Sequence, residues 1–327
     1  MSVRWDPGRS QRADQVVLMK KVVMIGGQMS TAVTQVGAEG IRQITILLVA
    51  KAGAMAREDA VAIEEPLEIQ LSFEKKGIRT VKSVSVTMRT PGNDRELAAG
   101  FLFTEGIIGD PTAIEGWELP EIARSGAAGG NTLRAIVREG VPVDLRTLER
   151  HFYTTSSCGV CGKTSLEALR VTGRITLDPD RPALEADMIG GLPAMLRADQ
   201  LIFEATGGLH AAGLFDGTGR LIAVREDVGR HNAVDKLIGA QVLEGNVPLA
   251  GHLLMVSGRA SFELVQKAVM AGIPVLAAVG APSTLAVDLA RQFGATLLGF
   301  VGPNRFNVYS GAQRLRFPPS AGLGTPG

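Results

Sequence analysis

The feature that most constrains the fold is a regular alternation of apolar strands and helices near the end of the chain. Short apolar runs at 252–256, 274–279 and 295–301 are separated by amphipathic segments at 261–270 and 284–293. Continuously apolar strands with a helix between each pair are typical of parallel sheets that are covered on both faces. The sequence therefore predicts an α/β domain with a partly parallel sheet.

A smaller unit of different character precedes this domain. Alternating apolar and polar residues predict strands at 66–73, 81–88 and 132–138, and the first two are expected to pair antiparallel around Gly77. A helix is predicted at 95–107, directly after capping residue types. This mixture predicts an α+β unit.

We divide the chain into four parts. Residues 1–58 show no clear strand-turn-helix rhythm and are expected to be a poorly ordered extension, whereas residues 316–327 are expected to be a loose Pro/Gly-rich tail. Residues 59–155 are expected to form the N-terminal α+β domain, and residues 156–315 the α/β domain. Regular structure is expected to begin near Ala60.

A hairpin and a helix are predicted ahead of the parallel strands. Strands at 209–215 and 220–225 flank the turn residues of 216–219. A helix follows at 230–243, and its buried stripe is expected to consist of Ala233, Leu237, Ile238 and Val242.

Glycine, hydroxyl and arginine residues follow each of these strands, where open parallel sheets bind their ligands. The segments are Arg230-His231-Asn232, Ser257-Gly258-Arg259, Gly280–Thr284 and Gly302-Pro303-Asn304-Arg305. Glycine permits close backbone approach, hydroxyls and helix N–H groups donate to oxyanions, and arginine binds phosphate bidentately. Together they predict a cradle for a phosphorylated ligand. Taken alone, Ser257, Ser283 or Asn232 is better explained as a helix cap, Arg259 could be a surface cation, and His231 is equally explained as a half-buried histidine.

Both cysteines of the chain lie in the stretch 156–163, SSCGVCGK. Cys158 and Cys161 precede a predicted short helix at 163–170, and a helix N-terminus together with Lys163 lowers the pKa of a thiol. Dithiol redox chemistry and sulfur transport are the favoured roles. A structural zinc site would have to recruit distant histidines as further ligands, and ordinary buried cysteines seldom occur as a glycine-flanked pair.

Composition excludes several other functions. A net charge of +1 and an aromatic content of 5% argue against a nucleic-acid binder and against binding to an anionic membrane. No apolar run reaches the roughly 18 residues of a membrane span, no signal peptide is evident, and two adjacent thiols suit a reducing compartment, so a cytoplasmic protein is expected. GxGxxG and GxxxxGK[ST] loops are both absent, which weakens dinucleotide and ATP interpretations.

Four ordered segments carry a resemblance to a known family. They are the helix NDRELAAGFLFTEGII at 93–108, the cysteine stretch, EDVGRHNAVDK at 226–236 and Ser257-Gly258-Arg259. Over about residues 60–315 the chain resembles the formate dehydrogenase accessory protein family (FdhD). The resemblance implies a three-layer, cytidine-deaminase-like larger domain that lacks the deaminase zinc site.

The resemblance also implies a function. Family members take persulfide sulfur from a cysteine desulfurase and pass it to the molybdenum or tungsten bis-guanine-dinucleotide cofactor needed by the formate dehydrogenase catalytic subunit. Cys158 and Cys161 are then the sulfur carriers, with Cys158 expected to hold the persulfide. The implied cofactor-binding segment is Phe300-Val301-Gly302-Pro303-Asn304-Arg305. Carboxylates such as Glu226 and Asp227 are expected to accept hydrogen bonds from the N–H face of a guanine. A homodimer is expected from the family, and no tightly held metal.

Three alternatives to a sulfurtransferase stay open at this point. One is a chaperone that holds the cofactor without transferring sulfur. Another is a thiol-disulfide oxidoreductase, although the chain lacks the Trp-Cys-Gly-Pro-Cys surroundings of thioredoxin-like proteins. The third is a zinc deaminase.

Overall fold

The computed structural model of the protein describes residues 17–25, 28–36, 40–51, 53–120, 131–144 and 177–318, the first two ranges as backbone only. The strands are β1 (Val17–Ile25), β2 (Gln28–Val36), β3 (Ile41–Ala50), β4 (Gly53–Ala62), β5 (Glu65–Lys75), β6 (Ile78–Arg89), β7 (Ile114–Glu118), β8 (Thr132–Val137), β9 (Leu184–Glu185), β10 (His210–Asp216), β11 (Leu221–Asp227), β12 (His252–Val256), β13 (Val275–Ala278), β14 (Thr296–Gly302), β15 (Arg305–Ser310) and β16 (Leu315–Arg316). The helices are α1 (Asp94–Thr104), α4 (Ala186–Ile189), α5 (Leu192–Ala198), α6 (Leu201–Thr206), α7 (Arg230–Leu243), α8 (Phe262–Met270) and α9 (Thr284–Gln292), with 3-10 turns η2 (Pro111–Ala113) and η3 (Ala312–Arg314). None of these described helices is long and apolar enough to cross a membrane.

The largest sheet has the strand order β11-β10-β12-β13-β14-β15. Strands β12, β13 and β14 are parallel neighbours, as the alternating apolar runs predicted. The predicted hairpin β10–β11 is antiparallel, and β10 also pairs antiparallel with β12. Strand β15, which the sequence analysis did not anticipate, pairs antiparallel with β14 at the far edge. Its residues are exposed or half-buried, so β15 carries little apolar signal.

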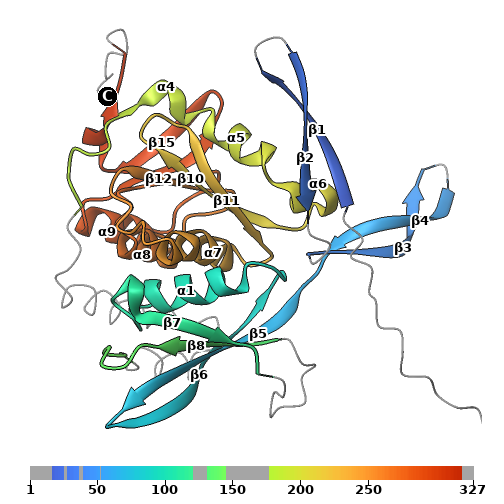
Figure 1. Ribbon diagram of the computed structural model, residues 1–327. Coiled ribbons are helices and arrows are strands. Elements are labelled where there is room, and N and C mark those ends of the chain that lie inside the picture. Colours follow the sequence, from blue (N-terminus) through green and yellow to red (C-terminus); the bar gives the residue numbers. More distant parts are fainter. Residues whose placement is uncertain are drawn as a thin grey trace, which may run out of the picture.

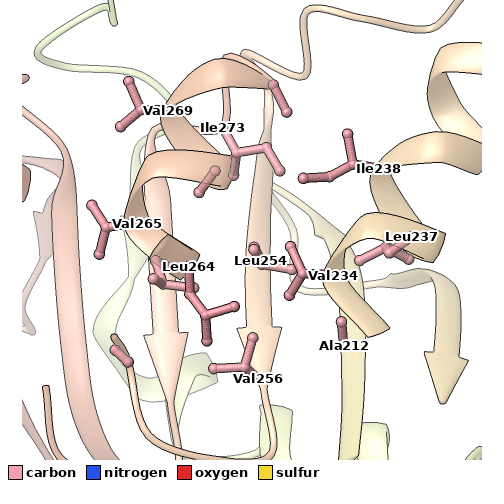
Figure 2. Packing of buried hydrophobic residues seen from close by; sticks show 14 of the residues in the cluster. Ala212, Val234, Leu237, Ile238, Leu254, Val256, Leu264, Val265, Val269 and Ile273 are labelled. Carbon is pink, nitrogen blue, oxygen red and sulfur yellow. The ribbon is translucent and has the colours of Figure 1, made fainter. Parts of the chain in front are cut away.

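Both faces of this sheet are buried by helices, because neighbouring residues on each strand point to opposite sides. On β12, Leu254 and Val256 pack with α7 and α8 (Figure 2). Leu253 and Met255 of the same strand pack instead with residues of α4 and α5. Figure 1 accordingly shows α7, α8 and α9 on one side of the sheet and α4 and α5 on the other. The described part of the chain is thus a mixed α/β structure, and its likeness to cytidine deaminases stays a prediction.

The N-terminal unit is a four-stranded sheet with the order β6-β5-β8-β7. The predicted antiparallel pair β5–β6 is confirmed, and β8 is parallel to β5. Helix α1 covers one face of this sheet, where Leu97 and Leu102 join Leu67, Ile69 and Leu71 in one buried cluster. Because the other side of α1 lies against α7, the helix sits between the two sheets (Figure 1).

Helix α1 is shorter than the sequence predicted. It ends at Thr104 rather than near Ile107, because Gly106 adopts a left-handed φ of 69°. The N–H of Ile107 then donates to Leu102 O at 2.9 Å, and the N–H of Gly106 donates to Phe103 O at 3.0 Å. This is the hydrogen-bond pattern of a Schellman C-cap, which glycine favours.

Helices α1 and α7 cross in direct backbone contact. A Cβ atom added to Gly100 of α1 would lie 1.9 Å from Asp235 O, and one added to Gly239 of α7 would lie 1.8 Å from Glu96 O. No side chain fits at either position. The two glycines therefore bring the helix axes closer together than any other residue pair would allow.

Strands begin earlier in the chain than the sequence analysis expected. Strands β3 and β4 pair antiparallel from Ile41 opposite Ala62, well before the predicted start near Ala60. Most residues of this hairpin are exposed. A strand that buries neither face against a core does not need alternating polarity, which explains why the pattern failed here. The four-part division of the chain stays a prediction, as does the tail at 316–327.

Candidate functional site

The carboxyl ends of four strands meet at one edge of the six-stranded sheet. Strand β11 runs in the same direction as β12, because both are antiparallel to β10, and β13 and β14 are parallel to β12. The segments at this edge are 227–231, 257–261, 279–283 and 300–305, and we call them together the carboxyl edge. Helices α8 and α9 begin directly after the second and third segments, and α7 begins within the first, as the sequence predicted.

Hydrogen bonds join the segments of the carboxyl edge to one another. The N–H of Gly280 donates to Gly258 O at 2.9 Å, and Gly280 O accepts from the N–H of Phe300 at 3.1 Å. His231 Nε2 lies 3.2 Å from Ser261 Oγ. The structure thereby brings the predicted residues His231, Ser257-Gly258-Arg259 and Phe300 onto one continuous edge, although they come from segments far apart in the sequence.

His231 lies at the start of α7 between charged neighbours. Burial, Arg230 and Lys267 lower the pKa of His231 to about 4, and Glu263 and Glu105 oppose that shift. Its Nε2 atom is 3.8 Å from Glu263 Oε2. The imidazole is therefore neutral at neutral pH and retains one ring nitrogen that can accept a hydrogen bond or a proton.

Within the triplet 257–259, the three residues differ in what they can offer a ligand. Ser257 Oγ accepts from Ala211 N at 2.9 Å, and Ser257 N donates to Ala211 O at 3.0 Å, so this serine extends the pairing of β10 with β12. Gly258 lies against His210, and Arg259 is exposed. Arg259 is thus the member of the triplet whose charge faces solvent.

The predicted segment 300–305 divides in a similar way. Phe300 adopts a φ of 52° and is 43% exposed, a combination that is uncommon for a bulky residue and is often found at functional positions. Val301 is buried in the core, so only its main chain can meet a ligand. Pro303, Asn304 and Arg305 are exposed at the turn between β14 and β15.

A cavity of about 560 Å³ lies beside the carboxyl edge. Its walls come from α5, α6, the start of β10 and the ends of β12 and β13, and it is lined by Pro193, Leu196, Arg197, Gln200, Phe203, Gly207, Gly208, Leu209, His210, Ser257 and Val279. The Arg197 guanidinium stacks 3.8 Å above the Phe203 ring. Burial and the charge of Arg230 lower the pKa of His210, so that the histidine at the cavity wall is also neutral. Volume and lining are in the range of small-molecule sites.

The carboxylates of Glu226 and Asp227 are committed to the protein rather than to a ligand. Glu226 accepts from the N–H groups of Ile202 and Phe203 at 2.9 and 2.8 Å, and burial raises its pKa. It therefore anchors α6, which forms one wall of the cavity. Asp227 is fully buried. The suggestion that these two carboxylates receive a guanine N–H face does not fit this arrangement.

The sulfur-carrying residues expected from the sequence, Cys158 and Cys161, lie outside the described residues, as does the helix predicted at 163–170. The residues that sequence reasoning missed are those of the cavity wall. Arg197, Phe203 and His210 stand in segments without a recognisable motif, and only the fold places them beside Ser257.

Comparison with known proteins identifies the family. The model of the FdhD/NarQ family matches residues 62–316. A sulfur carrier protein FdhD from Streptomyces avermitilis is 50% identical over 272 residues, covering 82% of this chain and 93% of that protein. The protein of the same name from Thermoplasma acidophilum is 42% identical over 291 residues, covering 88% and 97%.

The fold has a counterpart among solved structures. The crystal structure of a protein from Desulfotalea psychrophila, assigned as a formate dehydrogenase accessory protein, superposes with a TM-score of 0.62 at 24% sequence identity. It covers 85% of this chain and 100% of that chain. Since the family model spans most of the sequence and a relative is 50% identical over 82% of the chain, the chain belongs to the FdhD/NarQ family.

Proposed function

We propose that this protein is a sulfurtransferase that carries persulfide sulfur from a cysteine desulfurase to the molybdenum or tungsten bis-guanine-dinucleotide cofactor of formate dehydrogenase. The observation that carries the proposal is family membership together with both cysteines of the motif, Cys158 and Cys161. Relatives that cover most of the chain are named sulfur carrier proteins. The cofactor is the substrate of the reaction rather than a resident group.

The carboxyl edge supports the substrate half of the proposal. A guanine dinucleotide has flat bases and charged phosphates. The cavity beside the edge has apolar walls with a few polar groups, which suits a base, and Arg259 and Arg305 are exposed cations on the edge itself. The N-terminus of α7, whose N-cap residue Gly229 has no capping side chain, adds a positive dipole end.

The proposed sulfur chemistry balances with two cysteines. The Cys158 thiolate attacks the terminal sulfur of the desulfurase persulfide, a new S–S bond forms on Cys158, and the desulfurase cysteine leaves as thiolate. Cys161 thiolate then attacks Cys158 Sγ, which releases hydrosulfide to the metal and leaves a Cys158–Cys161 disulfide. The two electrons that reduce the carried sulfur come from the dithiol, and a cellular thiol reductant regenerates the pair.

Mass spectrometry after anaerobic incubation with a cysteine desulfurase and cysteine tests the proposal. We expect the mass of one added sulfur on the peptide with Cys158, loss of loading in Cys158→Ala, and a loaded but non-transferring protein in Cys161→Ala. An active formate dehydrogenase produced alongside the double alanine variant would instead indicate a cofactor-holding chaperone. Reversible disulfide formation with reductase turnover and no added sulfur would indicate an oxidoreductase.

A further inference from the structure

A buried acid–lysine pair lies where β11 reaches the carboxyl edge, at the junction of the two sheets. Asp227 ends β11, and its carboxylate lies 2.8 Å from Lys236 Nζ of α7. The Asp227 side chain is 0% exposed and the Lys236 side chain 2%. Burying two charges this completely is costly unless each finds several partners, so the remaining contacts of the pair decide what it does.

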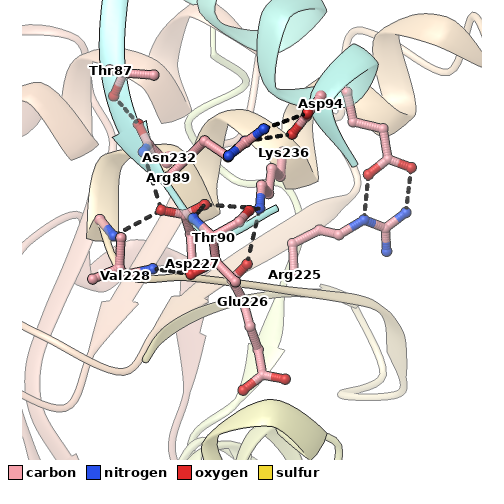
Figure 3. A network of polar contacts seen from close by, with 12 residues as sticks. Thr87, Arg89, Thr90, Asp94, Arg225, Glu226, Asp227, Val228, Asn232 and Lys236 are labelled. Atoms are coloured by element: carbon pink, nitrogen blue, oxygen red, sulfur yellow. Dashed lines mark hydrogen bonds and ion pairs between the residues drawn. The ribbon is translucent and has the colours of Figure 1, made fainter. Parts of the chain in front are cut away.

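The Asp227 carboxylate holds three further donors besides Lys236 (Figure 3). It accepts from Gly229 N at 2.8 Å, Asn232 Nδ2 at 3.1 Å and Thr90 N at 3.2 Å. Gly229 and Asn232 flank the turn that carries His231. Thr90, in contrast, follows β6 in the N-terminal unit, 137 residues earlier in the chain. One carboxylate therefore fixes the first turn of α7 against the other sheet.

The neighbours of Asp227 repeat the same connection between the two sheets. Lys236 Nζ donates to Thr90 O at 2.8 Å, and Val228 N donates to Thr90 Oγ1 at 3.2 Å. Asn232 Nδ2 donates to Met88 O at 2.7 Å. Thr90 thus engages its N–H, carbonyl and hydroxyl groups with residues 227, 236 and 228, respectively.

From this geometry we infer that Asp227 is a positioning residue, whose buried carboxylate orders the turn 228–232 so that Arg230 and His231 are presented to a ligand at the carboxyl edge. The inference rests on the proposed function for the identity of that ligand. It adds that the N-terminal unit, through Thr90, forms part of the frame of the site. Asp227 itself is out of reach of any ligand because it is fully buried.

Asp227→Asn tests the inference, because asparagine keeps the shape but presents an NH₂ group to donors. Asp235→Asn is the matched control. Asp235, on α7, is also a buried carboxylate and lies 3.0 Å from the buried Lys267 Nζ, but it accepts from Thr104 of α1 and does not contact the turn. Both variants are expected to lower the melting temperature, since each leaves a buried lysine with a poorer partner.

Two measurements distinguish a role of Asp227 in positioning the turn from a role in the stability of the fold alone. Hydrogen exchange of a peptide covering 226–234 is expected to rise in Asp227→Asn and to stay near wild type in Asp235→Asn. Binding of GDP, the nucleotide portion of the proposed substrate, is expected to weaken about tenfold or more in Asp227→Asn only, in line with the loss of a buried charged hydrogen bond. Equal exchange and equal GDP affinity in the two variants would overturn the inference. If the wild-type protein fails to bind GDP, the proposed substrate is wrong, and the exchange comparison alone decides whether Asp227 positions the turn.

Discussion

His231 is the edge residue whose charge state is most strongly set by its surroundings. Its pKa is lowered from 6.5 to about 4, first by burial and then by Arg230 and Lys267. Between these two values the unfolded chain binds a proton that the folded protein does not. By linkage, the stability from this group is complete above pH 6.5 and is lost as the pH falls toward 4.

We therefore expect His231→Gln to flatten the acid side of the stability profile. The free energy of unfolding, measured by urea denaturation, should fall more for the wild type than for the variant between about pH 6.5 and pH 4.5. Asp235 titrates in both proteins and cancels in the comparison, whereas the Glu263 carboxylate, 3.8 Å from His231 Nε2, loses this neighbour in the variant, and its change in titration is part of the expected difference. Parallel profiles for the two proteins would show that His231 is not held neutral by its neighbours.

Several residues whose types were recognised in the sequence have partners that no sequence pattern could reveal. Ser283 does cap its own helix, accepting from Ala286 N at 3.3 Å, and a cap of this kind is local enough to predict. Ser257 instead accepts from Ala211 N, 46 residues away, and Asn232 donates to Met88 O, 144 residues away. The sequence gives the chemical type of each side chain, but contacts between residues so far apart in the chain depend on tertiary packing.

Among the contacts between helices and strands, the crossing of α1 and α7 leaves the least room for an added side-chain atom. We expect Gly100→Ala and Gly239→Ala each to lower the free energy of unfolding by about 1–3 kcal/mol or more, because the added Cβ would overlap a backbone atom that cannot move alone. Gly251→Ala is a suitable control, since a Cβ there meets nothing within 4 Å. The free energy of unfolding of the three variants gives the comparison, and a tolerated Gly100→Ala would mean that the helices are free to separate.

The elements themselves were largely predictable, whereas their surroundings were not. Helix α7 and strand β12 have the predicted bounds, because both combine clear periodicity with clear ends. The predicted buried stripe of α7 is buried, but so are all the other residues from 232 to 242. The reason is that α1 covers the face of α7 that would be exposed to water if α7 packed only on the six-stranded sheet. The periodicity of one helix does not show that a second helix covers its other face.

For the whole molecule, the described core begins only after the N-terminal hairpins. The three buried clusters contain no residue before Leu67, whereas the β3–β4 hairpin meets the body through the contact of β4 with α6. A variant that begins at Met55 should therefore fold, with a melting temperature lowered by about 2–6 °C. Circular dichroism melts of this variant and the full chain decide the point. An unfolded variant would show that the hairpin belongs to the core, and an unchanged melting temperature would show that it adds nothing.

Glu226 and Asp227 are consecutive residues of β11, so their side chains leave the strand on opposite sides, one toward α6 and the other toward α7. A deletion or insertion of one residue within β11 would exchange the two directions, so that each carboxylate would point toward the wrong helix. Length variation among natural homologues should for this reason be confined to the turn at 217–220, where Thr218 and Arg220 are exposed, and the spacing between that turn and Gly229 should be invariant. A natural homologue with a different spacing would have to anchor α6 and the first turn of α7 by other means.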